Sequence, residues 1–197
     1  MDYLEAIKEY NSRQASPVIA KTALLVIDMQ RCFSGIAQSI FGNVMALIDA
    51  CRSVGVPVIF TRHGHRNPKE DGGMLAKWWG DLISYGSSEW ELIDGLKPEN
   101  SELLIDKTRY SAFHETELDE WLQRTGMEEL IITGVMTNCC CETTARDAFV
   151  RDYRVFFVAD ATATVNDELH LASLKNLAYG FAHIVTTRSL HECLKAI

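Results

Sequence analysis

Short apolar runs that alternate with helical segments constrain the fold of this chain more than any other feature of its sequence. Residues 22–27 form the continuous apolar run TALLVI. A strand that is apolar on both faces is typical of the interior of a parallel sheet covered by helices. The pattern recurs, so we expect strands at 22–27, 56–61, 103–105, 129–134, 154–159 and 182–186.

Helical periodicity fills the gaps between these runs. We expect helices at 44–54, 115–124 and 168–178, a helix after 134, and a last helix opened by the capping box Ser189-Leu190-His191-Glu192. In the helix after 134, Cys141, Ala145, Ala148 and Phe149 form one stripe suited to packing on a sheet. Alternating strands and helices predict an α/β fold with three layers, α/β/α, around a six-stranded, mainly parallel sheet.

One domain accounts for the 197 residues. We expect residues 1–20 to be an accessory helix, formed over 2–13, that packs on the domain or on another subunit, and residues 21–197 to be the domain. A net charge of −8 argues against nucleic acid as a partner. No apolar run reaches the roughly 18 residues of a membrane span, and no secretory leader is recognised, so we expect a cytoplasmic protein with no membrane partner.

Polar residues follow the predicted strands where a parallel sheet binds its ligands, at the carboxyl ends. Asp28 follows the first strand, Lys107 follows the third, and three consecutive cysteines in GVMTNCCCETTARDA follow the fourth. A thiol in the first turn of a helix faces the positive end of the helix dipole, which favours the thiolate. A carboxylate, an amine and a thiol at one sheet edge indicate a nucleophile with a base and a cation. The glycine-rich signatures of dinucleotide and nucleoside triphosphate sites are absent.

The motifs ALLVIDMQRCF, DKTRYSAFHETEL and GVMTNCCCETTARDA together resemble the isochorismatase-like cysteine hydrolases, a Rossmann-like superfamily that includes nicotinamidases, N-carbamoylsarcosine amidase and ureidoacrylate amidohydrolase. The resemblance runs from about Lys21 to the last helix. It implies a catalytic set of Asp28, Lys107 and Cys140, with Cys139 as the second choice for the nucleophile. The implied reaction cleaves the C–N bond of a small amide through a thioester and releases ammonia.

The resemblance also implies an oxyanion hole. Its donors would be the backbone N–H groups of Met136 and Cys140, next to a cis peptide bond between Met136 and Thr137. Preorganised donors of this kind stabilise the tetrahedral intermediate of acyl transfer.

Aromatic side chains near these motifs are candidates for the substrate pocket. Phe33 resembles the aromatic residue that stacks on the substrate ring in nicotinamidases. Tyr110 and Phe113 follow the lysine, and Trp78 or Trp79 is expected to close a lid formed by residues 63–100, a connection too long to be a passive linker. Ordinary core packing is the alternative for each of them.

His63 and His65 stand where the metal-binding nicotinamidases carry an Asp-x-His pair. Two imidazoles alone are a weak metal site, so we expect no metal and no cofactor. We expect His63 and His65 to bind substrate by hydrogen bonds or to be structural, and a divalent metal held between them is the alternative.

Other functions within the superfamily stay open at this point. An isochorismatase-type vinyl-ether hydrolase would use Asp28 as an acid and would need no thiol, and a ureido or carbamoyl amidohydrolase would use the same three residues. A non-enzymatic interaction module of the same fold is a third class. The resemblance further implies a homo-oligomer, with residues 63–100 or the N-terminal helix as contacts.

Overall fold

Six parallel strands form one sheet in the computed structural model, which describes residues 3–195. The strand order is β3-β2-β1-β4-β5-β6, and all five pairings are parallel. This confirms the predicted α/β class and the strand number. The strands are β1 (Thr22–Ile27), β2 (Val58–His63), β3 (Leu103–Lys107), β4 (Glu129–Val135), β5 (Arg154–Ala163) and β6 (His183–Val185).

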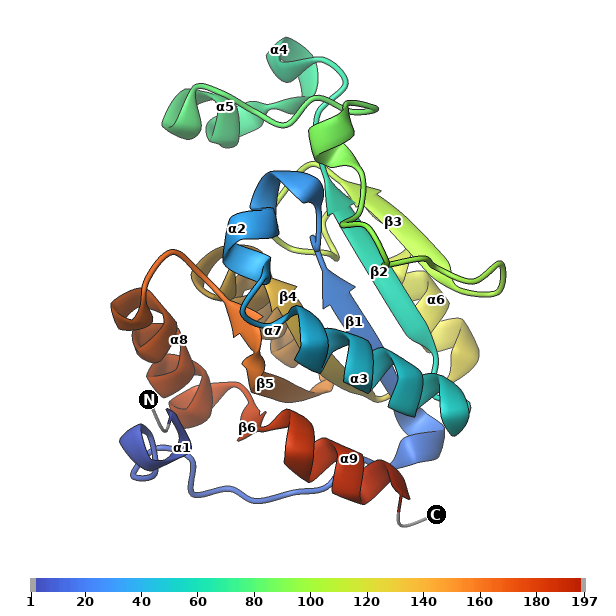
Figure 1. The fold of residues 1–197 in the computed structure, drawn as a ribbon, viewed down its shortest axis with the longest axis vertical. Coiled ribbons are helices and arrows are strands. Elements are labelled where there is room, and N and C mark those ends of the chain that lie inside the picture. Colours follow the sequence, from blue (N-terminus) through green and yellow to red (C-terminus); the bar gives the residue numbers. More distant parts are fainter. Residues whose placement is uncertain (1–2, 196–197) are drawn as a thin grey trace.

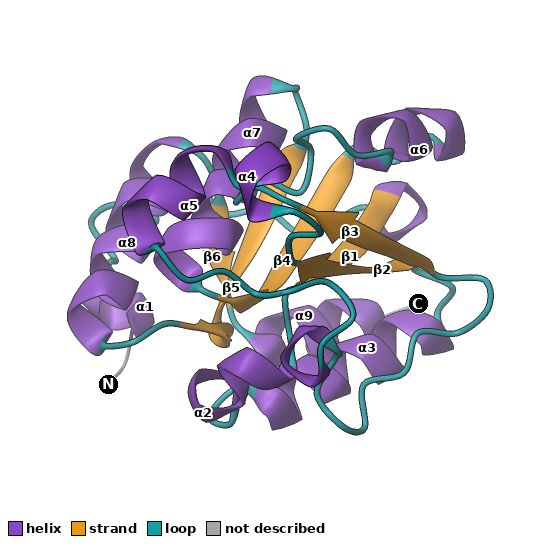
Figure 2. Cartoon of the chain, turned by 90° about the horizontal axis from the view of Figure 1, so that it is seen from above, coloured by secondary structure: helices purple, strands orange, loops and turns teal. Residues whose placement is uncertain are grey.

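Helices cover both faces of the sheet (Figure 2). On one face lie α2 (Ser34–Ala37), α3 (Phe41–Ser53) and α9 (Thr187–Lys195); on the other lie α6 (Leu118–Thr125), α7 (Glu142–Val150) and α8 (Asp167–Gly180). Each face of the sheet has its own core. Successive residues of β1 point to opposite faces, so Leu25 packs with α6, α7 and α8, while Leu24 packs with α3 and α9.

The two central strands approach each other closely at Gly134. Gly134 of β4 pairs with Ile27 of β1 and has a φ of 110°. A Cβ atom at this position would lie 2.0 Å from the carbonyl oxygen of Ile27. Only glycine fits there, both for the backbone angle and for the space.

Strands β2, β3 and β5 extend further toward their carboxyl ends than the apolar runs suggested. β2 ends at His63 rather than residue 61, β3 continues through Lys107, and β5 continues to Ala163. The added residues in β2 and β3 pair with each other, His63 with Lys107. Hydrophobic patterning stops where side chains become polar, whereas backbone pairing continues.

The N-terminal segment differs from the predicted helix. Within the described part of 2–13, only Tyr3–Ala6 (α1) is helical, and turns follow; residue 2 lies outside the described range. Ile7 is nevertheless fully buried in the core beside α8. Asn11 fixes the following extended segment to β6, because its amide donates to the carbonyl of Ile184 and accepts from the N–H of Ile184. The segment is thus packed on the domain.

Two predictions about the helices were wrong: the position of Phe149 and the start of the last helix. Phe149 does not belong to the buried stripe of α7, because its side chain is exposed and lies edge-to-face against Phe181. The last helix begins at Thr187, two residues before the predicted capping box. Ser189 instead bonds back to Thr186, through Thr186 N–H to Ser189 Oγ and Ser189 N–H to Thr186 Oγ1.

Two short helices lie beyond the carboxyl ends of β2 and β3 (Figure 1). They are α4 (Pro68–Asp71) and α5 (Gly73–Trp79), and the 3-10 turn Ser88–Trp90 follows them. No single helix within residues 3–195 has the length and apolar character to cross a membrane; Arg31–Ala37 and Phe41–Ser53 reach that composition only as a pair bent by 103°.

Candidate active site

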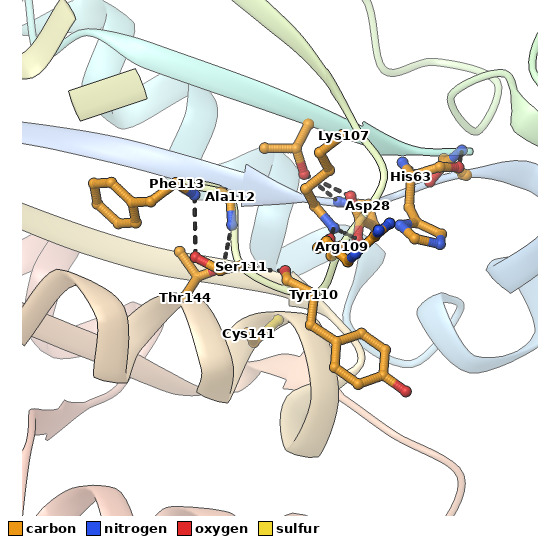
Figure 3. Close-up of polar contacts among 12 residues, drawn as sticks. Asp28, His63, Lys107, Arg109, Tyr110, Ser111, Ala112, Phe113, Cys141 and Thr144 are labelled. Atoms are coloured by element: carbon orange, nitrogen blue, oxygen red, sulfur yellow. Dashed lines mark hydrogen bonds and ion pairs between the residues drawn. The ribbon is translucent and has the colours of Figure 1, made fainter. Parts of the chain in front are cut away.

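Asp28 and Lys107 form a fully buried ion pair. Asp28 directly follows β1, and Lys107 is the last residue of β3, so the ends of two non-adjacent strands supply the two groups. Lys107 Nζ donates to Asp28 Oδ2 at 2.7 Å and to the carbonyl oxygen of Arg109 at 3.0 Å (Figure 3). Burial alone would lower the pKa of Lys107, but the negative charge of Asp28 and the hydrogen bonds to Asp28 and Cys140 outweigh burial and raise it. Lys107 is therefore a permanent cation.

Thr61 holds the other oxygen of the Asp28 carboxylate. Its Oγ1 donates to Asp28 Oδ1 at 2.6 Å and accepts from the Asp28 N–H at 3.2 Å. Asp28 has a φ of 48°, a left-handed conformation that is uncommon outside glycine. Both carboxylate oxygens therefore have one donor each, and the carboxylate is fixed in orientation. Nothing in the sequence had indicated Thr61, because a threonine at a strand end has no distinctive pattern.

The turn that carries the cysteines is wider than an α-helical turn. Thr137–Cys141 is a π-helical turn, in which the carbonyl of Met136 accepts from the N–H groups of Cys139 and Cys141 at 3.1 and 3.2 Å. π-turns occur often at functional sites. The cis peptide bond joins Val135 to Met136. The expectation of a cis bond between Met136 and Thr137 was therefore wrong by one residue.

His170 anchors this turn from α8. Thr137 Oγ1 lies 2.8 Å from His170 Nδ1, and His170 Nε2 lies 3.1 Å from the carbonyl oxygen of Ala159. A carbonyl only accepts, so Nε2 carries the proton and Nδ1 accepts from the Thr137 hydroxyl. Burial lowers the pKa of His170, which keeps this tautomer neutral. His170 was also absent from the sequence-based assignment.

Cys140 lies against the ion pair. Its side chain is buried and hydrogen-bonds to Asp28. Burial raises the pKa of the Cys140 thiol well above its ordinary value; Lys107 opposes this rise, while Asp28 and Cys139 add to it. The sequence argument that the helix start would favour a thiolate therefore does not hold in the resting site. The thiol keeps its proton and presents it to Asp28.

A pocket with a volume of about 290 Å³ opens beside Cys140. Its size is at the low end for small-molecule sites, and most of its wall is apolar. Four of the predicted substrate-binding residues line it, namely Phe33, His63, Trp79 and Tyr110. The remaining lining residues are Leu75, Asp81, Leu82, Ile83, Met136, Cys139 and Cys140.

Three predicted pocket residues lie elsewhere. Phe113 is buried in the core and stacks on Tyr153 at 5.9 Å; Figure 3 shows its ring turned away from Asp28 and His63. Trp78 is 77% exposed and is not part of the pocket wall. His65 is buried outside that wall, with Nδ1 3.1 Å from Asp71 Oδ1. An aromatic residue next to a motif can face either way, and sequence spacing alone did not separate these cases.

His63 lines the pocket and has one buried ring nitrogen without a partner in the described part of the chain. One ring nitrogen bonds to the backbone of Arg109, whereas Nδ1 is buried and has no partner among residues 3–195. Burial, reinforced by the charge of Lys107, lowers the pKa of His63 to about 4. The ring is therefore neutral near pH 7, and with its proton directed at the Arg109 carbonyl, Nδ1 carries a free lone pair.

Gln30 fixes the strand end that carries His63. Its side-chain amide donates to the carbonyls of His63 and Trp90 at 2.9 and 2.7 Å and accepts from the N–H of His63 at 2.8 Å. Gln30 is fully buried. The sequence did not mark Gln30 as part of the site, because glutamine is mostly exposed in proteins and its burial here is visible only in the structure.

His63 and His65 are the two residues considered as metal ligands. Across residues 3–195, no group of three or more His, Cys, Asp and Glu side chains is arranged to hold a metal ion. The rings of His63 and His65 lie 5.0 Å apart, edge to face. The donor set is therefore two imidazoles, which is fewer than the three protein ligands of a typical catalytic zinc site.

The fold and this site define an α/β protein with a buried cysteine beside an aspartate and a lysine at the carboxyl edge of a parallel sheet. The family model described as the isochorismatase domain matches residues 22–189, so the chain belongs to the isochorismatase family.

Among similar proteins, nicotinamidase 3 of Arabidopsis thaliana is 48% identical over 95% of this chain and 96% of its own length. Enterobactin synthase component B of Escherichia coli K12 is 36% identical over 86% of this chain and 62% of its own length. Among solved structures, a cysteine hydrolase from Pseudomonas syringae superposes with a TM-score of 0.88 at 28% identity, covering 93% of this chain and 96% of that chain.

Proposed function

We propose that the protein is a cysteine amidohydrolase that cleaves the C–N bond of a small amide such as nicotinamide and releases ammonia. The observation that carries the proposal is the contact between the buried Cys140 thiol and the Asp28–Lys107 pair, next to a small pocket with aromatic walls. The similarity to the Arabidopsis nicotinamidase supports the choice of substrate.

In the first half of the proposed reaction, Asp28 takes the proton of the Cys140 thiol as sulfur attacks the amide carbon. Because the pKa of this thiol is raised by burial, the proton leaves during attack rather than beforehand. Lys107 stabilises the negative charge that develops on sulfur and then on oxygen. The protonated Asp28 next gives its proton to the leaving nitrogen, the C–N bond breaks, and ammonia and a thioester result.

In the second half, a water molecule gives a proton to Asp28 and attacks the thioester carbon. The C–S bond breaks, the acid is released and Cys140 regains its proton. We propose that the backbone N–H groups of Met136 and Cys140 hold the oxyanion in both halves. Removal of one such donor typically costs about 3 kcal/mol in the barrier.

His63 is proposed to bind the amide nitrogen of the substrate. His63 lines the mostly apolar wall, its buried Nδ1 has no partner within the described residues 3–195, and a carboxamide N–H is the donor that a small amide brings. Phe33, Tyr110 and Trp79 would then contact the ring.

We also propose that the protein works in the cytoplasm as a homo-oligomer. All six cysteines are free, which suits a reducing compartment. Met74 and Trp78 expose large apolar side chains on α5, which suits contact with a second copy.

The test is ammonia release from nicotinamide by the wild type, by Cys140→Ala and by Cys139→Ala. Cys140→Ala should lose activity on the order of a thousandfold or more, and mass spectrometry of the wild type during turnover should show a nicotinoyl adduct on Cys140. Full activity in Cys140→Ala would refute the thioester mechanism. If Cys139→Ala alone abolished turnover, Cys139 would be the nucleophile. Turnover of isochorismate without an adduct would favour vinyl-ether hydrolysis, and a panel with ureido and carbamoyl amides tests the other amidohydrolase activities.

A further inference from the structure

The loop that follows Lys107 contacts both ends of helix α5, which covers the pocket. At the start of the helix, Arg109 Nη1 donates to the carbonyl oxygen of Asp71 at 2.6 Å. Gly73 has a φ of 52°, and a Cβ atom there would lie 2.5 Å from Arg109 Nη2. At the end of the helix, Trp79 Nε1 donates to the hydroxyl of Tyr110 at 2.7 Å. Arg109 and Tyr110, which are consecutive in this loop, therefore contact the two ends of α5.

Tyr110 also lies with Cys139, from the turn that carries the proposed nucleophile, in the pocket wall. A side-chain interaction with Tyr110 opposes the rise in the pKa of the Cys139 thiol that burial causes. An indole N–H can only donate, so the Tyr110 oxygen accepts from Trp79 and its own hydrogen is left to donate to the Cys139 sulfur. The three side chains form a directed chain, Trp79 to Tyr110 to Cys139, and all three line the pocket.

Trp78 provides an internal comparison. It is the adjacent residue on α5, yet it is 77% exposed and lies outside the pocket wall. Trp79 is itself 55% exposed, so its packing alone leaves much of the ring in water. The hydrogen bond to Tyr110 is the polar contact that links the end of α5 to the body of the protein.

We infer that Tyr110 is a positioning residue, which fixes the Trp79 wall of the pocket relative to Cys139 and thereby sets the affinity for the substrate. Cys139 is then a hydrogen-bond acceptor in the wall rather than a second nucleophile. Its neighbour Cys140 keeps its separate contacts with Asp28 and Lys107. Loss of the chain should loosen the wall and leave the reacting groups in place.

This inference rests on the proposed amide hydrolysis for its kinetic test. The variants are Trp79→Phe, Tyr110→Phe, Cys139→Ala and Cys139→Ser, with Trp78→Phe as the matched control. Trp79→Phe and Tyr110→Phe should each raise KM for nicotinamide about two- to tenfold, the range expected for one hydrogen bond, with kcat changed less than twofold. Cys139→Ala should behave in the same way, and Cys139→Ser, which keeps an acceptor, should restore KM. Trp78→Phe should change neither constant.

The double variant Trp79→Phe/Tyr110→Phe tests whether the residues act in series. Its KM should match that of Tyr110→Phe alone, because Tyr110→Phe already removes the acceptor of the Trp79 N–H. Multiplicative effects of the two substitutions would overturn the inference. Equal effects of Trp78→Phe and Trp79→Phe would also overturn it, since that result would reflect general packing of α5.

A second measurement does not need the substrate. In a Cys140→Ala background, alkylation of Cys139 by iodoacetamide, located by mass spectrometry, should be several times faster with Trp79→Phe and unchanged with Trp78→Phe. An unchanged rate with Trp79→Phe would refute the inference. If the wild type releases no ammonia from nicotinamide, the proposed function fails, while this measurement still decides the role of Tyr110.

Discussion

Lys107 Nζ lies 2.7 Å from Asp28 Oδ2, and neither side chain has any surface exposed to solvent. Two opposite charges this deeply buried depend on each other, because removal of one leaves the other without compensation. The pair is therefore a structural element as well as the base and cation of the proposed reaction.

Lys107→Met should accordingly reduce activity and stability together. We expect the free energy of unfolding to fall by about 3–5 kcal/mol, the typical cost of removing one partner from a buried pair. The double variant Lys107→Met/Asp28→Leu should recover much of that stability while staying inactive, because it buries no unpaired charge. Urea denaturation of both variants measures this, and a double variant less stable than the single one would contradict it.

Thr61→Val should show how much the orientation of the Asp28 carboxylate contributes to kcat, because the substitution leaves the charge of Asp28 in place. Valine has nearly the shape of threonine, but it loses the hydroxyl that donates to Asp28 Oδ1. We expect a loss of stability of about 1–3 kcal/mol and a lower kcat with KM little changed, because Thr61 does not line the pocket. Thr61→Ser keeps the hydroxyl and should retain most of kcat. Steady-state kinetics of the two variants provide the measurement, and equal kcat values would argue against this role.

The buried His63 should make stability depend on pH. Its pKa is about 4 in the folded protein, compared with about 6.5 in an unfolded chain. Between these values the unfolded state binds more protons, so the free energy of unfolding decreases as pH falls from 6.5 to 4. The full effect of His63 is about 3 kcal/mol.

His63→Gln removes this titration. The difference in unfolding free energy between wild type and His63→Gln, measured by denaturant at several pH values, should therefore shift by that amount across the interval and be flat above pH 7. A difference that does not change with pH would show that His63 is not held neutral by the fold.

Phe33 and Phe113 form a matched pair of aromatic residues with opposite expected effects. Phe33 lines the pocket, so Phe33→Ala should raise KM for the substrate. Phe113 is buried in the core against Tyr153, so Phe113→Ala should lower the free energy of unfolding by roughly 3–5 kcal/mol. Kinetics and thermal denaturation of both variants decide the point. A larger effect of Phe113→Ala than of Phe33→Ala on KM, at a temperature where both are folded, would reverse our assignment.

The sequence predicted the sheet well because its strands are continuous apolar runs, and it placed Asp28, Lys107 and Cys140 at one edge because parallel strands end together. The sequence did not predict whether an aromatic side chain in a loop faces the core or the pocket. Phe113 and Tyr110 lie three residues apart in one loop, yet one packs in the core and the other faces the pocket. That choice depends on tertiary neighbours such as Tyr153 and Trp79.

The protonation state of Cys140 was a second property that the sequence did not predict. The dipole of a helix start favours a thiolate at Cys140, but the extent of burial cannot be judged from local sequence, and burial raises the pKa of this thiol well above its ordinary value. Thr61 and His170 escaped notice for a related reason. Each acts on the site through hydrogen bonds to residues that are distant in the sequence, and neither belongs to a repeating pattern.

Gly134 has a consequence for how this enzyme can vary. The residue opposite it, Ile27, directly precedes Asp28, and β4 leads within six residues to Cys140. A methyl group at position 134 would separate the strands and so move Asp28, the proposed proton acceptor, away from Cys140. The distance between Asp28 and Cys140 therefore depends on the absence of a Cβ atom at position 134. Substitution there would damage catalysis without touching any group that takes part in it.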